Sequence, residues 1–203
     1  MTGNFHYFSS KEEKHQERFR LMRDKILRVF LKPLIWLHIS PNMLTFVSFI
    51  SLGGFFYFFI DNPWFSIIFL FAHVLLDGVD GPLARATGKS SRAGSFLDML
   101  NDHTGMVIVV ATVIHYSMLD SLLGLTYVYT YSLLIVFILY QNSLGVPPSI
   151  VFRSKYLFYA LYMLWALSGI NIFNVTTAIF ILFTSISLVA GGVKIFSILK
   201  SQK

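Results

Sequence analysis

The stretch DGVDGPLARATGKSSRAGSFLDMLND, residues 77–102, places four aspartates within two long apolar segments of the chain. An ionised carboxylate inside a bilayer span costs roughly 2.5–3.5 kcal/mol on insertion scales, so such residues are rare and usually functional. Carboxylates that converge repel one another unless cations offset their charge, and oxygen ligands favour hard ions such as Mg²⁺, Mn²⁺ or Ca²⁺. We therefore expect a cation-dependent site formed by Asp77, Asp80, Asp98 and Asp102.

The composition of the whole chain indicates a membrane protein. Of its 203 residues, 55% are hydrophobic and 13% are charged, whereas soluble domains carry about 25% charged residues. The apolar runs are long enough to cross a hydrocarbon core of about 30 Å, and they are continuous rather than alternating, which argues against a β-barrel. We expect an all-α, polytopic membrane protein with six transmembrane helices, preceded by a cytoplasmic interfacial amphipathic helix. The expected spans are 42–60, 64–86, 92–117, 121–141, 153–170 and 174–198.

The chain divides into two parts of different composition. Residues 1–40 form the expected cytoplasmic N-terminal segment, and residues 41–203 form the expected six-helix transmembrane catalytic domain. In residues 17–38, apolar side chains recur at helical spacing among basic ones, which is typical of a helix lying at anionic headgroups. The chain opens polar and charged, unlike a secretory signal. It contains no cysteine, which excludes disulfides, thiolate catalysis and zinc–sulfur sites.

The distribution of basic residues predicts the orientation in the membrane. All sixteen Lys and Arg residues fall on one side of the expected spans, and half of them precede the first span. By the positive-inside rule, this places both termini in the cytoplasm. The net charge of +6 therefore reflects topology, and we expect no nucleic-acid partner.

The spacing of the four aspartates predicts where they meet. Asp77 and Asp80 are three residues apart, and Asp98 and Asp102 are four apart, so each pair shares one face of a helix. The two helices form a hairpin joined at the cytoplasmic side, and at 1.5 Å per residue the pairs lie at similar depth. Small residues gather on the same faces, and Arg85 adds a fork suited to phosphate. Divalent ions, an arginine and exposed backbone are the parts that phosphoryl transfer requires.

These residues resemble the signature of a known family. The pattern Asp77-x-x-Asp80-Gly81-x-x-Ala84-Arg85, then eight residues, then Gly94-x-x-x-Asp98-x-x-x-Asp102, is similar to that of the CDP-alcohol phosphotransferases at all eight fixed positions. The stretch Ser40-Pro41-Asn42-x-x-Thr45 at the start of the first span is also similar to family members. The resemblance implies an integral membrane enzyme of phospholipid synthesis. Such an enzyme moves a phosphatidyl group from a CDP-activated donor, such as CDP-diacylglycerol, to the hydroxyl of a polar alcohol and releases CMP.

The resemblance also implies a role for each matching residue. Two divalent ions, Mg²⁺ or Mn²⁺, are expected on Asp77, Asp80 and Asp98, with Asp102 sharing one of them and acting as general base. Gly81, Ala84 and Gly94 would leave room for the cytidine diphosphate, next to Asp80, and Arg85 would contact phosphate. Family members are commonly homodimers, so a homodimer is expected.

The acceptor alcohol is not assigned by the pattern. Met99 and His103 follow the third and fourth aspartates, and they match none of the glycerol phosphate, inositol phosphate or serine patterns of the family. Arg153 and Lys155, at the start of the fifth span, and Arg92, at the start of the third, are candidates for binding a phosphate on the acceptor.

Two other functional classes remain open from the residues alone. A divalent-cation transporter or channel also carries acids within its spans, although transporters usually show internal repeats and broken helices. An inactive scaffold could retain the motif, although all eight fixed positions are intact here.

Overall fold

The computed structural model describes residues 31–145, 151–152 and 154–201, and this part of the chain contains helices and no strands. A short helical turn covers residues 31–36. The six long helices are α2 (Pro41–Phe58), α3 (Pro63–Ala86), α4 (Arg92–His115), α5 (Ser121–Ser143), α6 (Lys155–Ser168) and α7 (Phe173–Ser201).

Local sequence signals explain where these helices begin. Ser40 accepts a hydrogen bond from the Met43 amide and is followed by a proline at the first helical position of α2. Ser91 caps α4 in the same way, through the amide of Gly94. A side-chain oxygen at the N-cap satisfies a backbone amide that has no partner within the helix, and proline is well suited to the first turn.

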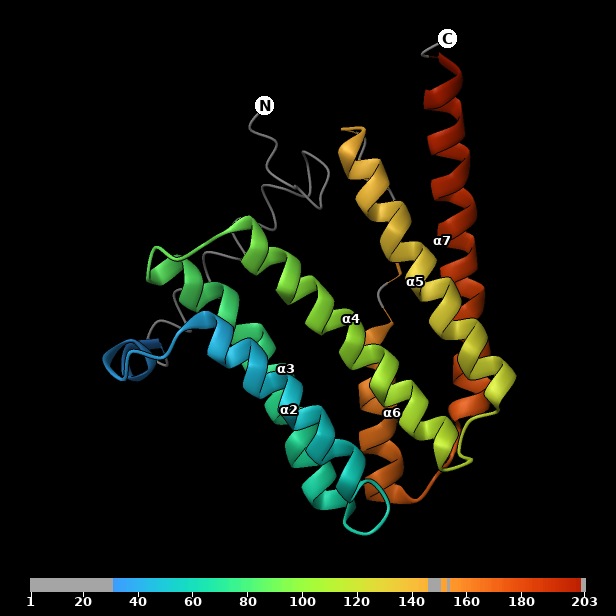
Figure 1. Cartoon of the computed structure of the whole chain (residues 1–203). Helices are drawn as coiled ribbons and strands as arrows, with labels where there is room; N and C mark the ends of the chain where they lie inside the picture. Colours follow the sequence, from blue (N-terminus) through green and yellow to red (C-terminus); the bar gives the residue numbers. More distant parts are fainter. Residues whose placement is uncertain (1–30, 146–150, 153, 202–203) are drawn as a thin grey trace.

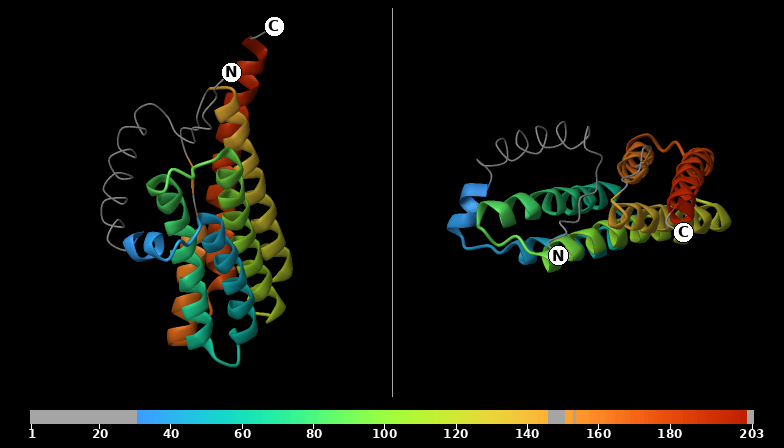
Figure 2. Two further views of the ribbon diagram at one scale, coloured as in Figure 1. Left: turned by 60° about the vertical axis from the view of Figure 1, so that its left-hand side comes forward. Right: turned by 90° about the horizontal axis from the view of Figure 1, so that it is seen from above.

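The helices form an antiparallel bundle (Figure 1). α2 packs along α3 and α5 packs along α7, while α4 contacts α2, α3 and α5, and α6 contacts α3. The N-terminal ends of α2 and α4 and the C-terminal ends of α3, α5 and α7 point toward the same end of the bundle (Figures 1 and 2). The α3–α4 hairpin therefore carries its two aspartate pairs on neighbouring, antiparallel helices, as the spacing predicts.

Aromatic side chains fill the opposite end of the bundle. The ring of Phe59 lies 4.9 Å from those of Tyr116 and Tyr162 and 5.5 Å from that of Trp165, measured between centroids. Phe55 packs edge-on against Tyr162 at 5.0 Å. Such pairs stabilise a core beyond their area of burial, so they join the ends of α2, α4 and α6 away from the aspartates.

Five of these helices are long and apolar enough to cross a membrane, namely all but α6. α6 has 14 residues and so extends about 21 Å, which is less than a hydrocarbon core of about 30 Å. It ends at Gly169, whose φ of 73° is readily adopted only by glycine. The helix at the expected span 153–170 is two residues shorter at each end, and the helices at the other five spans also begin and end within three residues of the prediction. Most of the expected interfacial helix, 17–38, lies outside the described residues.

Candidate active site

Asp77 of α3 lies at the centre of the site and is nearly buried. Its Oδ1 accepts a hydrogen bond of 2.6 Å from Asn101 Nδ2 on α4. Its Oδ2 lies 3.8 Å from the Nζ atom of Lys155 on α6. The two oxygens thus have different partners, a neutral amide on one side and a cation on the other.

Lys155 joins the two aspartate pairs. It is the first residue of α6, is 2% exposed, and forms ion pairs with both Asp77 and Asp102. Its ammonium group also lies 5.1 Å and 5.5 Å from the ring centroids of Tyr156 and Tyr159. Because a buried charge is costly unless it is paired, Lys155 and the two carboxylates offset one another. A positive charge therefore occupies the position between α3 and α4 where the sequence requires one.

Asp80 is held by a different helix. Its Oδ2 accepts a hydrogen bond of 2.6 Å from Thr45 Oγ1 on α2, whereas its Oδ1 is buried without a hydrogen-bond partner among the described residues. Asp98 lies one turn before Asp102 on α4 and is half-buried. The structure thus joins Asp77 and Asp102 through Lys155 and places Asp80 on the same helix as Asp77.

The donor set fits a divalent cation, although a compact ligand cluster is not formed. Within the described residues, no group of three or more His, Cys, Asp or Glu side chains is close enough to hold a metal ion. The ammonium of Lys155 instead offsets the charge of Asp77 and Asp102. The orphaned Oδ1 of Asp80 is the observation in favour of a metal, because a buried carboxylate oxygen requires a donor or a cation.

The small residues of the motif, Gly81, Ala84 and Gly94, have different surroundings in the structure. A Cβ atom at Gly81 would lie 3.5 Å from Arg85 Nη1, so the guanidinium extends over the glycine. Ala84, on the same helix, is half-buried. A Cβ atom at Gly94 would lie 3.2 Å from Ser91 Oγ, the atom that caps α4. Gly94 therefore allows the close approach of the capping serine at the start of this helix.

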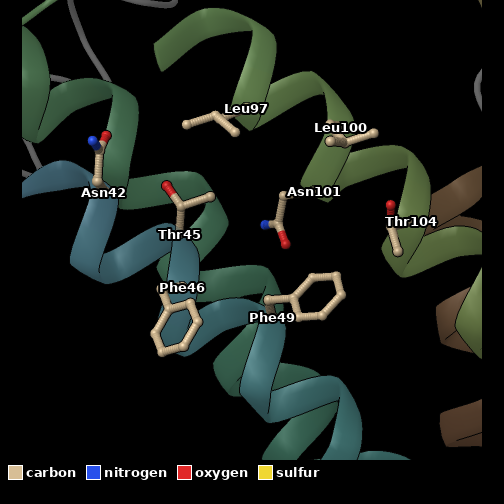
Figure 3. Close-up of a pocket in the computed structure, with 8 residues that line it drawn as sticks. All are labelled: Asn42, Thr45, Phe46, Phe49, Leu97, Leu100, Asn101 and Thr104. Atoms are coloured by element: carbon tan, nitrogen blue, oxygen red, sulfur yellow. The ribbon is translucent and has the colours of Figure 1, made fainter. Parts of the chain in front are cut away.

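A cavity of about 400 Å³ lies between α2 and α4, beside the aspartates. Its lining is mainly apolar, and Figure 3 shows Thr45 and Asn101 on its walls. These two residues hold Asp80 and Asp77, so the cavity adjoins the acidic site. The lining residues are Asn42, Thr45, Phe46, Phe49, Leu97, Leu100, Asn101 and Thr104.

Of the three residues predicted to bind the acceptor, the structure describes the side chain of Lys155 but not those of Arg153 and Arg92. The structure places Lys155 among the aspartates rather than at the edge of the site. Arg153 lies outside the described residues, and so does the side chain of Arg92, whose backbone begins α4. Sequence reasoning gave no role to Asn101, which contacts Asp77; the available signal was an amide next to an aspartate in an apolar helix.

The fold and this acidic site define a helical membrane protein with several long apolar helices and a buried ionic centre. The chain belongs to the CDP-alcohol phosphatidyltransferase family, whose sequence model matches residues 38–193. This match contains both aspartate pairs and the start of α2.

Two relatives carry names for the synthesis of inositol lipids. Over 72 residues the chain is 44% identical to the archaetidylinositol phosphate synthase of Pyrococcus horikoshii, covering 35% of this chain and 38% of that protein. Over 97 residues it is 29% identical to the phosphatidylinositol phosphate synthase of Cutibacterium acnes, covering 44% of each. The similarity thus spans less than half the length of either relative.

Solved structures share the fold. The phosphatidylinositol phosphate synthase of Mycobacterium tuberculosis with CDP-DAG bound superposes with a TM-score of 0.64 at 17% identity, over 81% of this chain and 90% of that one. The same synthase in complex with manganese and citrate gives a TM-score of 0.63 at 16% identity, over 79% and 84% of the two chains.

Proposed function

We propose that this protein transfers a phosphatidyl-type group from a CDP-activated lipid to the hydroxyl of a polar alcohol and releases CMP. The observation that carries the proposal is the arrangement of the two aspartate pairs on α3 and α4. Asp77 and Asp80 are buried, Lys155 forms ion pairs with Asp77 and Asp102, and one oxygen of Asp80 has no hydrogen-bond partner among the described residues. The family membership of the chain and the names of its relatives support the same reaction.

We assign the metal ligands to Asp77, Asp80, Asp98 and Asp102, which would hold two divalent ions, Mg²⁺ or Mn²⁺. When bound, such ions polarise a diphosphate and stabilise the leaving nucleotide. The complex of the mycobacterial synthase with manganese supports this assignment. Asp102 acts as the general base that accepts the proton of the acceptor hydroxyl, because its side chain is 39% exposed whereas that of Asp77 is 7% exposed. Asp98 is the second residue expected to act directly in catalysis.

The nucleotide and the lipid occupy neighbouring regions. Gly81, Ala84 and Gly94, together with Asp80, leave space for the cytidine diphosphate, and Arg85 binds its phosphates. The cavity between α2 and α4 has the apolar lining that suits a lipid-linked donor. The mycobacterial synthase with CDP-DAG bound supports a donor of this class.

The acceptor is a phosphorylated polyol of the inositol phosphate kind. Both named relatives are synthases of inositol phosphate lipids, although His103 departs from the pattern that the sequence analysis associates with this acceptor. Lys155 is the described cation nearest to Asp102, the proposed base, so its ammonium can bind the phosphate of the acceptor. Arg153 and Arg92 are the further candidates for this contact.

The architecture that we propose has six crossings. α6 is the fifth and shortest of them, and residues 41–203 form the catalytic domain. Both termini lie in the cytoplasm, and the active site opens there, since every Lys and Arg lies on that side of the expected spans. The helical turn at 31–36 runs across the direction of α2 (Figure 2), which supports an interfacial helix in the segment 1–40. A homodimer is part of the same proposal.

One assay tests the reaction. Purified protein is incubated with Mn²⁺ and CDP-diacylglycerol or its archaeal ether counterpart, a panel of alcohols including inositol phosphate is added, and CMP is measured. CMP release that depends on the acceptor supports the enzyme. Ion flux through protein-containing vesicles, without CMP release, would instead support a divalent-cation transporter.

Substitutions connect the assay to the site. We expect Asp98→Asn and Asp102→Asn to lower transfer by at least a hundredfold without unfolding the protein. Asp98 is an assigned metal ligand, and a general base such as Asp102 contributes about 10²–10⁴-fold. Asp61→Asn, at an exposed position between α2 and α3, is the matched control and should retain activity. A wild-type rate in either site variant would contradict the assignment.

A further inference from the structure

A buried hydrogen-bond network extends from Asp77 and joins side chains of three helices, α2, α3 and α4. Asn101 Nδ2 on α4 donates to Asp77 Oδ1 at 2.6 Å and to Ser48 Oγ on α2 at 3.1 Å. Ser48 Oγ lies 2.8 Å from His73 Nδ1 on α3 and donates to the His73 carbonyl oxygen at 3.2 Å. Asn101 is 4% exposed, and Ser48 and His73 are fully buried.

The direction of the two hydrogen bonds of Asn101 is fixed by chemistry, whereas the direction between Ser48 Oγ and His73 Nδ1 depends on the imidazole tautomer. An ionised carboxylate can only accept, and an amide nitrogen can only donate, so Asn101 must turn its NH₂ group toward Asp77. Both amide hydrogens are then used, one on the carboxylate and one on the Ser48 hydroxyl. Ser48 in turn is held by two atoms of His73, so Asn101 cannot rotate without breaking a second hydrogen bond.

The contact leaves one oxygen of Asp77 available. Asn101 holds Oδ1, while Oδ2 faces the Lys155 ammonium at 3.8 Å. Asp80 shows the same division, because Thr45 holds Oδ2 while Oδ1 has no partner among the described residues. A neutral donor on one oxygen orients the carboxylate without offsetting the charge that a cation would bind.

His73, at the end of the hydrogen-bond network farthest from Asp77, is held in place by close packing. A Cβ atom at Gly105 of α4 would lie 2.4 Å from His73 Nε2, which is closer than non-bonded atoms can approach. The glycine therefore allows the imidazole to press against α4, and the ring cannot move away from Ser48 in that direction.

A second buried amide in the molecule provides a contrast. Gln141 of α5 is 1% exposed and donates to the backbone carbonyl of Gly191 on α7 at 2.8 Å. That contact joins two helices and involves no aspartate. Asn101 makes a contact of similar burial and length, but its acceptor is a carboxylate of the active site.

We propose that Asn101 is a positioning residue, supported by Ser48 and His73, which holds the Asp77 carboxylate in the orientation that binds the divalent cation. The inference rests on the proposed function, since it takes Asp77 as a metal ligand. Partners that orient a metal ligand typically contribute 10–100-fold to metal affinity.

The test measures Mn²⁺ binding to the purified full-length protein in lipid nanodiscs, by the loss of the free-ion signal in electron paramagnetic resonance. We expect Asn101→Leu to weaken Mn²⁺ binding by 10–100-fold and Ser48→Ala to weaken it by a smaller factor. The control for the amide is Gln141→Leu. The control for the serine is Ser66→Ala, because Ser66 is fully buried on α3 and donates to the Phe55 carbonyl of α2 at 2.9 Å. Both controls should leave Mn²⁺ affinity within twofold of wild type.

Three outcomes distinguish the ideas. Equal Mn²⁺ affinity in Asn101→Leu and Gln141→Leu, with Asp77→Asn strongly impaired, would overturn the positioning role and leave the proposed function intact. Equal affinity in wild type and Asp77→Asn would instead overturn the proposed metal site itself. If Asn101→Leu does not fold, Ser48→Ala measured against Ser66→Ala decides, and equal affinity in that pair also overturns the inference.

Discussion

Replacing Lys155 by methionine should lower the stability of the metal-free protein and raise its affinity for Mn²⁺. Methionine keeps much of the length and apolar volume of the lysine but removes the ammonium that pairs with Asp77 and Asp102. In metal-free protein, loss of one partner from a buried ion pair costs about 3–5 kcal/mol. We expect Lys155→Met to be destabilised by this amount when a chelator is present.

A divalent cation should reverse that loss. Two unit charges about 4 Å apart, close to the 3.8 Å between Lys155 Nζ and Asp77 Oδ2, interact by about 4 kcal/mol at an effective dielectric constant of 20. The lysine therefore competes with the cation for the same carboxylate. If a third of this attraction opposes cation binding, removing the lysine ammonium strengthens Mn²⁺ binding about tenfold, because 1.4 kcal/mol corresponds to a factor of ten.

The assay is thermal unfolding in detergent across a Mn²⁺ titration, with Lys200→Met at the exposed end of α7 as the control. The variant should unfold well below wild type in chelator and approach it in saturating Mn²⁺, while the control follows wild type throughout. Kinetically, the KM for a phosphorylated acceptor should rise because Lys155 no longer binds its phosphate. A stability loss of the same size with and without Mn²⁺, at unchanged Mn²⁺ affinity, would refute the reasoning.

Two further substitutions test other contacts of the site. Gly105→Ala should destabilise the protein by about 1–3 kcal/mol, the usual cost of overpacking, because its Cβ would meet His73 Nε2; Gly53→Ala, with open space around its Cβ, should show no loss in the same denaturation curves. Thr45→Val removes the hydrogen bond to Asp80 and should cost about 1–3 kcal/mol and weaken Mn²⁺ binding in titrations; unchanged binding would show that this hydroxyl does not orient the carboxylate.

The helices were predictable because their ends carry local signals. Pro41 follows an N-cap serine, and Pro63 follows an N-cap asparagine, so the starts of α2 and α3 fall within one residue of the prediction. The start of α6 carries no side-chain cap hydrogen bond. Its predicted start lies two residues before the first residue of the helix.

The sequence predicts which site residues share one face of a helix, but not which residues of other helices contact them. The spacing predicts that Asp77 lies near the aspartates of the third span, and in the structure Lys155 pairs with both Asp77 and Asp102. The contacts of Thr45 with Asp80 and of Lys155 with Asp77 depend on how α2 and α6 pack against the α3–α4 hairpin. No periodicity within a single helix reports that packing, so Lys155 was predicted as an acceptor contact while its ion pairs to the aspartates were not foreseen.

The flank of the cavity between α2 and α4 has a kinetic consequence. Phe46 and Phe49 on one helix, and Leu97 and Leu100 on the other, are between 42% and 65% exposed and would face hydrocarbon in a bilayer. A lipid donor that diffuses in the leaflet would then enter the cavity laterally, and its acyl chains would stay in the hydrocarbon core of the bilayer. Saturation would then follow the mole fraction of donor in the membrane rather than its bulk concentration, and diluting vesicles with inert lipid would slow the enzyme at constant total donor.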